Sequence, residues 1–178
     1  QNMQQAKSYH FQTRIQYASQ DFAEEISGQW LSPDRIQIQG NFLNNQESQI
    51  IQIGSETWLK APWTDEWSLF SGTQLSQTEI FYLELNPQLW LQIPPQTPIE
   101  QCNENSASQT WLLTLHPTLS DGFFQERQLS LQYQLELNPK TRQFVQAQIT
   151  ALTPEQTNYF VLQISWFNLN QPLQIEAP

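Results

Sequence analysis

The stretch Gln128-Leu-Ser-Leu-Gln-Tyr-Gln-Leu-Glu-Leu137 places an apolar side chain at every second position. A period of two that persists over a whole segment predicts a β-strand with one buried face and one face in water. The turn-forming pair Asn138-Pro139 follows, and the alternation resumes in Phe144-Val-Gln-Ala-Gln-Ile149. The two segments therefore predict an antiparallel hairpin whose polar face is mostly glutamine.

The same alternation recurs along most of the chain. It predicts an up-and-down meander of strands with short links, in which Ser32-Pro-Asp34 and Gly54-Ser55 are turns. Further strands are expected near the end of the chain, after the hairpin at residues 128–149. The expected strands besides the hairpin are 9–17, 22–31, 35–40, 49–53, 57–60, 110–116, 157–167 and a short terminal segment at 173–175.

Other segments lack this period. Residues 1–8 suit a short helix, and Pro87 allows a helix to begin at about Asn86 and to stop before Ile93-Pro-Pro95. The tryptophan-containing segment from Ala61 is expected to be a loop, as is the polar segment Gln101 to Gln109. Residues 117–127 fit a loop or a short helix.

Composition limits the classes of function. The chain has 178 residues, a formal net charge of −10 and only 7 Lys and Arg, which argues against binding to nucleic-acid phosphates or direct docking on anionic lipid. About 30 glutamines take the place of charged residues. A glutamine-rich chain can be disordered, but 7 Trp, 10 Phe and the regular alternation argue for a folded sheet.

The balance of sheet and helix suggests how the sheet is shaped. Apolar strand surface left in water costs about 25 cal/mol per Å², and the expected helices are too short to cover a sheet of this size. We therefore expect one domain over residues 1–178, α+β but mostly β. Its curved antiparallel sheet is expected to have a hydrophobic concave face that helices cover only in part. A closed, well-packed core is the alternative.

Several segments together resemble the LolA/LppX-like bacterial envelope lipoproteins. Ala6-Lys-Ser-Tyr-His-Phe11 is similar to the entry into their first strand, and Gly28-Gln-Trp-Leu-Ser-Pro-Asp-Arg-Ile36 to their second hairpin. Ile51-Gln-Ile-Gly-Ser-Glu-Thr-Trp-Leu-Lys60, with Trp63 and Trp67, resembles a further hairpin region of the family. The ending Phe167-Asn-Leu-Asn-Gln-Pro-Leu-Gln-Ile-Glu-Ala-Pro178 resembles their closing strand.

This resemblance implies a half-open β-barrel wrapped over a few short helices on its concave face, around a hydrophobic cavity. It also implies a non-enzymatic carrier of a lipid, glycolipid or lipoprotein in the bacterial cell envelope, in the periplasm or on the outer face of the cytoplasmic membrane. The family's usual anchor is a lipidated cysteine upstream of the mature domain. A signal peptide precedes that cysteine. Residues 70–127 depart from the family pattern, because the helices that would line the cavity are hard to find there.

The strand parity, together with the aromatic residues, predicts which side chains line the cavity, since apolar ligand sites are mostly hydrophobic and aromatic. The alternative for each aromatic side chain is ordinary core filling. The expected lining residues are Phe11, Ile15, Ile26, Trp30, Ile36, Ile38, Ile51, Trp58, Trp67, Phe81, Leu85, Trp90, Tyr133, Leu135, Ile149, Leu162 and Ile164.

No catalytic, metal or cofactor motif is evident. His10 and His116 lack metal-pair spacing, and Cys102 has no neighbouring cation to activate its thiol. We therefore expect no cofactor, no metal, no enzymatic activity and no nucleic-acid partner. An envelope sensor or protein-interaction module on the same fold is the competing hypothesis, with Trp63 and Trp67 in an exposed loop as the contact for a protein partner or membrane.

Overall fold

The computed structural model describes residues 6–43, 45–71, 90, 93–117, 124 and 126–178. Strands dominate this part of the chain, and they all belong to one antiparallel sheet. The strands are β1 (Ser8–Tyr17), β2 (Glu24–Leu31), β3 (Arg35–Leu43), β4 (Gln46–Ile53), β5 (Glu56–Lys60), β6 (Ser68–Ser71), β7 (Ile99–Asn105), β8 (Thr110–Leu115), β9 (Ser130–Asn138), β10 (Gln143–Leu152) and β11 (Asn158–Phe167).

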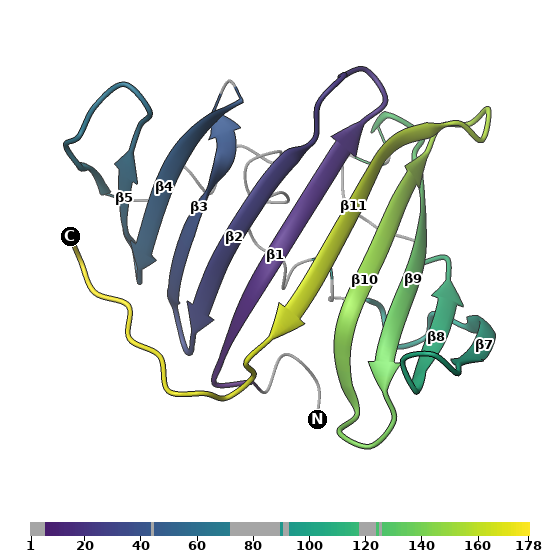
Figure 1. Cartoon of the computed structure of the whole chain (residues 1–178). Helices are drawn as coiled ribbons and strands as arrows, with labels where there is room; N and C mark the ends of the chain where they lie inside the picture. Colours follow the sequence, from purple (N-terminus) through teal and green to yellow (C-terminus); the bar gives the residue numbers. More distant parts are fainter. Residues whose placement is uncertain (1–5, 44, 72–89, 91–92, 118–123, 125) are drawn as a thin grey trace.

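The order of strands in space is β6-β5-β4-β3-β2-β1-β11-β10-β9-β8-β7. Sequential strands are neighbours except for β6 and β7, which lie at opposite edges, and the first and last strands pair at the centre of the sheet. The sheet stays open, with β6 at one edge and β7 at the other. Figure 1 shows its strands steeply tilted and twisted, with β8 and β7 turning away at one side. This is a curved, half-open barrel, as the sequence predicts.

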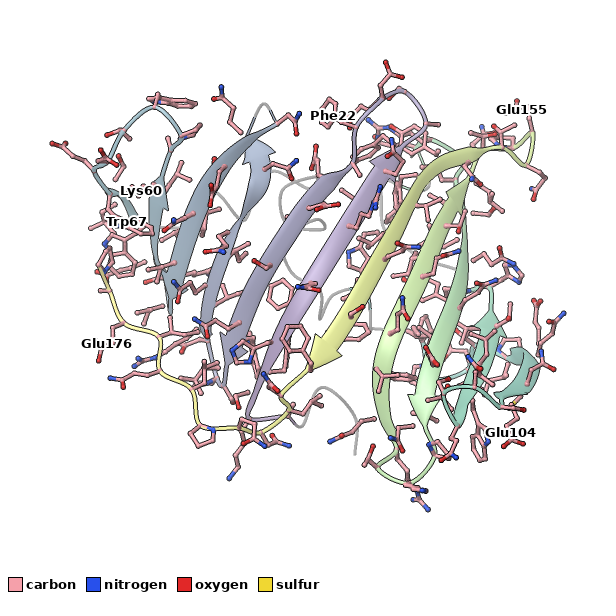
Figure 2. The ribbon with its side chains drawn as sticks, viewed as in Figure 1. Phe22, Lys60, Trp67, Glu104, Glu155 and Glu176 are labelled. Atoms are coloured by element: carbon pink, nitrogen blue, oxygen red, sulfur yellow. The ribbon has the colours of Figure 1, made fainter. Side chains whose placement is uncertain are left out.

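Side-chain parity separates the sheet into two faces. The inner face is defined here as the face that carries Phe11 and Ile15 of β1, and the outer face as the opposite one. Phe11 and Ile15 are 0% and 1% exposed. Gln12 and Arg14, which lie between them in the sequence and point outward, are exposed. The large hydrophobic cluster of the molecule lies on the inner face. Figure 2 places the labelled charged residues Lys60, Glu104, Glu155 and Glu176 at the periphery of the molecule.

The C-terminal residues after β11 form no strand, which corrects the expected terminal strand at 173–175. They leave the end of β11 and run toward β5 (Figure 1). Asn170 anchors their start to β1, because its Oδ1 accepts from the Lys7 amide at 2.7 Å and its amide donates to the Ser8 carbonyl at 2.8 Å. Arg35 anchors their end by donating from Nη1 to the Ile175 carbonyl at 2.8 Å.

The expected loop at Gln101–Gln109 is also wrong, because Ile99–Asn105 forms edge strand β7. Every residue of β7 is exposed, so neither of its faces needs apolar side chains. Its sequence therefore lacks the alternation of apolar and polar residues that would predict a strand. Strand β6, which follows the tryptophan-containing loop, was not among the expected strands. The expected helix at 1–8 gives way to β1 from Ser8 onward, and the helix expected from Asn86 falls outside the described residues.

Candidate functional site

The inner face is built outward from the central pair of strands. Phe11 of β1 lies opposite Gly28 of β2 on one side and Trp166 of β11 on the other. Ile15 lies opposite Leu162 in the same way. Because paired residues of neighbouring strands share a face, these positions project to one side of the sheet. The pairing continues through β3 and β4 at one end and through β10, β9 and β8 at the other.

Most of the residues that were expected to line a cavity lie together on this face. Their register places them on one side of the sheet, and each is buried or packed against the inner-face cluster. Their role in binding a ligand stays a prediction. They are Phe11, Ile15, Ile26, Trp30, Ile36, Ile38, Tyr133, Leu135, Ile149, Leu162 and Ile164.

Ile51 and Trp58 lie on the outer face, so their expected place in the cavity is wrong. Ile51 pairs with Gln37 and with Trp58, whereas its neighbour Ile50 pairs with the inward Ile38. Adjacent strand residues point to opposite faces, so only one of two consecutive isoleucines can face inward. Ile51 is nevertheless only 6% exposed. It does not belong to the main cluster, and its cross-strand partner on β5 is Trp58.

Trp90 does join the inner face, although it lies on none of the strands. It is 3% exposed and packs edge-on against Phe160 at 5.7 Å and Phe124 at 6.0 Å between ring centroids. Trp67 lies in the loop between β5 and β6 and is not part of the cluster, which corrects its expected place. Phe81 and Leu85 lie outside the described residues.

Several inner-face residues were missed by the sequence prediction of the site. Tyr9 stacks on Trp30 with ring centroids 5.2 Å apart, and Trp166 and Phe160 are 4% and 3% exposed. Strand parity could have found them, since Phe160 and Trp166 are even-numbered like the predicted Leu162 on the same strand. The other missed members are Ala6, Ile50, Leu113, Leu115, Phe124, Leu131, Ala147 and Ala151.

Gly28 explains how an aromatic ring fits at the centre of this face. A Cβ at position 28 would collide with the Phe11 ring and would lie 2.7 Å from the Gln37 carbonyl oxygen. The missing side chain therefore lets the Phe11 ring lie flat over β2.

Among the residues that the structure describes, Thr13 Oγ1 and Trp166 Nε1 lie on this apolar face without a hydrogen-bond partner, in residues that are each 4% exposed. Tyr133 adds a third polar group, and burial raises the pKa of its hydroxyl well above the ordinary value, so it stays neutral. The inner face is thus largely apolar but carries a few buried polar atoms, and half-buried Glu24, opposite Ile15, adds a carboxyl group at the start of β2.

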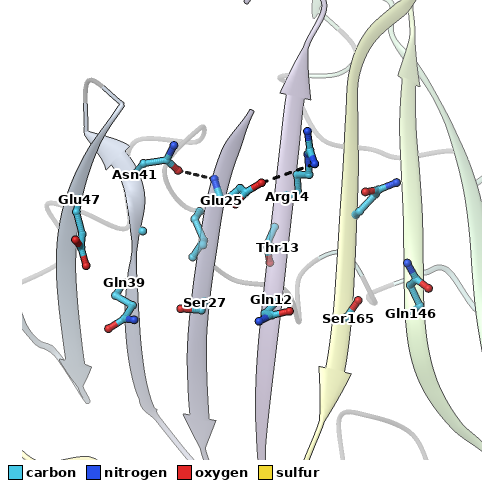
Figure 3. A pocket seen from close by; sticks show the side chains of 13 residues that line it. Gln12, Thr13, Arg14, Glu25, Ser27, Gln39, Asn41, Glu47, Gln146 and Ser165 are labelled. Carbon is cyan, nitrogen blue, oxygen red and sulfur yellow. Dashed lines mark hydrogen bonds and ion pairs between the residues drawn. The ribbon is translucent and has the colours of Figure 1, made fainter. Parts of the chain in front are cut away.

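The outer face is polar and holds a shallow groove of about 640 Å³ across β3, β2, β1, β11 and β10. Figure 3 shows its lining of amides and hydroxyls, including Gln12, Ser27 and Gln146. Arg14 and Glu25 form an ion pair across it at 3.7 Å, and both side chains are largely in water. Such a surface is well solvated and offers no apolar cover to a ligand.

The described residues contain no group of three or more His, Cys, Asp or Glu that could hold a metal ion. His10 stacks on Phe167 at 5.6 Å, and His116 Nδ1 lies 2.8 Å from a Glu100 carboxylate oxygen near the β7 edge. Cys102 is a free, exposed thiol on β7. Over the part of the chain that the structure describes, no helix is both long and apolar enough to cross a membrane.

No protein-family model and no curated protein sequence matches this chain. Solved structures do match it. The LppX lipoprotein of Mycobacterium tuberculosis is similar over 97% of this chain and 91% of its own, with a TM-score of 0.57 and 11% identity. LprF of Mycobacterium bovis is similar over 98% and 90%, with a TM-score of 0.53 and 10% identity. The chain therefore has a LolA/LppX-like fold.

Proposed function

We propose that this protein is a non-enzymatic lipid-binding carrier of the bacterial cell envelope, which holds acyl chains against the inner face of its sheet. The observation that carries this proposal is the continuity of that face. Apolar side chains from β1, β2, β3, β4, β8, β9, β10 and β11 form one cluster on one side of an open sheet. The likeness in fold to LppX and LprF supports the same reading.

The chemistry of the face matches an acyl chain better than a polar metabolite. Moving a methylene from water into an apolar environment is favourable by about 0.8 kcal/mol. A sixteen-carbon chain therefore gains roughly 10 kcal/mol before the cost of ordering it, which allows micromolar binding or tighter. Every Lys and Arg residue is exposed or half-buried, so the lining gives no reason to prefer an anionic ligand.

The cellular setting belongs to the same proposal. A carrier of this kind would work in the periplasm or on the outer face of the cytoplasmic membrane, held by a lipid anchor upstream of Gln1. The net charge of −10 favours such an anchor over direct electrostatic docking on anionic lipid.

Two measurements test the proposal. Mass spectrometry of an organic extract of the purified protein should reveal a copurifying acylated molecule. Titration with a fluorescent phospholipid should saturate and should change tryptophan emission, because Trp30, Trp90 and Trp166 lie in the inner-face cluster. Absence of both a copurifying lipid and saturable uptake at tens of micromolar would refute the carrier function.

A second candidate function rests on a different residue. Trp63, in the loop between β5 and β6, is 71% exposed, and a large exposed aromatic side chain is a common anchor at protein interfaces. A sensor that reports to a partner protein through this loop would form a stable complex and would carry no lipid. Trp63→Ser would then abolish the complex, whereas a lipid carrier with this change would bind phospholipid as before.

A further inference from the structure

Two unpartnered hydrogen-bond donors lie near the centre of the inner face. Trp166 lies opposite Phe11, and Thr13 is the next residue of β1 on the same side. Diagonal neighbours of this kind in an antiparallel sheet are about 7–8 Å apart, within reach of an aromatic side chain. Each residue is only 4% exposed, and neither Thr13 Oγ1 nor Trp166 Nε1 has a hydrogen-bond partner within the part of the chain that the structure describes.

An orphaned buried donor is costly, because it has lost its hydrogen bonds to water and gained none in return. The indole N–H can only donate, and the threonine hydroxyl can donate as well as accept. The group that would satisfy both is therefore an acceptor oxygen inside the apolar face. A pure hydrocarbon ligand would leave both donors unsatisfied.

The charge distribution decides which acceptor fits. None of the seven Lys and Arg residues belongs to the inner-face cluster. Arg14, Arg35 and Lys60 occupy outward positions of their strands, since they pair with Glu25, Ile53 and Gln49 of the outer face. A carboxylate buried beside Thr13 would have no counter-charge and would be strongly disfavoured, whereas a neutral carbonyl would not.

We propose that Thr13 and Trp166 form a polar anchor that donates hydrogen bonds to the ester carbonyl of a neutral acyl ester. This inference rests on the proposed lipid-binding function and names its substrate class. The acyl chain lies along the aliphatic side chains of the inner face, and the two donors fix the position of the ester along that face. The protein thereby distinguishes an esterified lipid from a hydrocarbon and from a free fatty acid.

The test compares three ligands of similar length, which are methyl palmitate, octadecane and palmitate, by displacement of a fluorescent phospholipid. Wild-type protein should bind methyl palmitate more tightly than octadecane, by about fivefold for each hydrogen bond formed. Palmitate should bind more weakly than its methyl ester. Thr13→Val, which keeps the shape of the side chain, should reduce the preference for the ester about fivefold and leave octadecane binding unchanged. Trp166→Phe should do the same.

Thr13→Ser keeps the hydroxyl and should keep the preference. Thr57→Val is the matched control, since Thr57 is also buried on the inner face but lies on β5, far from the anchor in the order of strands. Infrared spectra of methyl palmitate labelled with ¹³C at the carbonyl give a direct readout. The carbonyl band should move to lower wavenumber in wild-type protein and back in Thr13→Val.

The outcomes separate the two proposals. Equal affinity of the wild type for ester and hydrocarbon, or an unchanged preference and carbonyl band in Thr13→Val, would overturn the anchor while lipid carriage stands. Failure of the wild type to bind any of the three ligands or the phospholipid would overturn the carrier function, and the anchor with it.

Discussion

The two faces of the sheet are made from the same strands but differ in how their side chains pack and form hydrogen bonds. On the inner face, aliphatic and aromatic side chains pack together and leave a few polar atoms unpaired. On the outer face, glutamines pair across strands, as when Gln29 Nε2 donates to Gln37 Oε1 at 2.7 Å and Gln163 Nε2 donates to Gln148 Oε1 at 3.2 Å. Some outer polar groups are thus satisfied where they lie, although His10 Nδ1 on this face has no hydrogen-bond partner among the described residues. The inner face differs in that its buried donors, Thr13 Oγ1 and Trp166 Nε1, lie among apolar side chains.

The largest expected effect comes from placing a charge on the inner face. Ile38 is 3% exposed and belongs to the main cluster, so Ile38→Glu should unfold the protein. An unpaired buried carboxylate costs several kcal/mol, out of a total stability of about 5–15 kcal/mol. Urea denaturation followed by tryptophan fluorescence would measure the loss.

Gln37→Glu is the matched control, because residue 37 is the neighbour of Ile38 on the outer face. The new carboxylate can still accept the hydrogen bond from Gln29 that the Gln37 amide oxygen accepts. We expect a change within about 0.5 kcal/mol. Equal damage from both variants would contradict the assignment of the two faces.

The next largest effect tests an apolar patch on the outer face, made of Ile51 and its cross-strand partner Trp58. Ile51→Ala should cost about 2–5 kcal/mol, as in a core, because Ile51 is 6% exposed. If the C-terminal segment covers this patch, Ile51→Ala and Ile175→Ala should be non-additive by at least about 0.5 kcal/mol. Gln49→Ala, on the same face of β4, should be nearly neutral. Full additivity would show that Ile51 and Ile175 are buried independently of each other.

Gly28→Ala should destabilise the protein by about 1–3 kcal/mol, because an added methyl group would press into the Phe11 ring on the inner face. The neighbouring outward change Ser27→Ala should have little effect. Thermal unfolding of the two variants would compare the faces at adjacent positions. A tolerated alanine at position 28 would show that the Phe11 ring can move aside.

A smaller effect is expected at Glu136, which lies beside Leu135 but faces outward. Hydrogen bonds from Ser108 and then Thr110 hold the pKa of this carboxyl below its ordinary value of 4.5. A lowered pKa in the folded state adds stability above the ordinary pKa, and that stability disappears as the pH falls through the lowered value. Ser108→Ala should therefore cost a few tenths of a kcal/mol at about pH 7 and almost nothing in strong acid. A loss that does not depend on pH would exclude the carboxylate as its source.

The smallest effect is expected at Cys102. Its side chain is an exposed, free thiol on edge strand β7, so Cys102→Ser should change neither stability nor lipid uptake. Denaturation and phospholipid titration of this variant would reveal any role. A loss of either property would mean that β7 contributes more than an edge strand.

The sequence predicted the parts of the sheet where alternation is strict. In β9, apolar and polar residues alternate without interruption, and in the middle of β1 only Thr13 breaks the alternation, so both the strands and their inward residues were predicted correctly. Ile36 and Ile38 were placed correctly for the same reason. The open, curved sheet followed from the excess of apolar strand surface over helix.

Other features could not be predicted from the period of two. Strand β7 is exposed on both faces, so nothing in its side-chain pattern distinguishes it from a loop. The pair Ile50-Ile51 fits either parity, and only the pairing with Ile38 decides which one faces inward. Nor could the unpaired state of Thr13 Oγ1 and Trp166 Nε1 be predicted, because hydrogen-bond satisfaction depends on atomic contacts rather than on spacing.

The pairing of β1 with β11 has a consequence for how the protein folds. These two strands form the centre of the sheet, yet His10 and its partner Phe167 come from opposite ends of the chain. Each wing of the sheet is a meander of local hairpins and can form quickly, but the wings can join only when the last strand has been made. Closing so long a loop is slow, and the apolar faces of both wings stay in water until it happens. Newly made chains should therefore fold in two stages, with aggregation competing most strongly just before β11 docks onto β1.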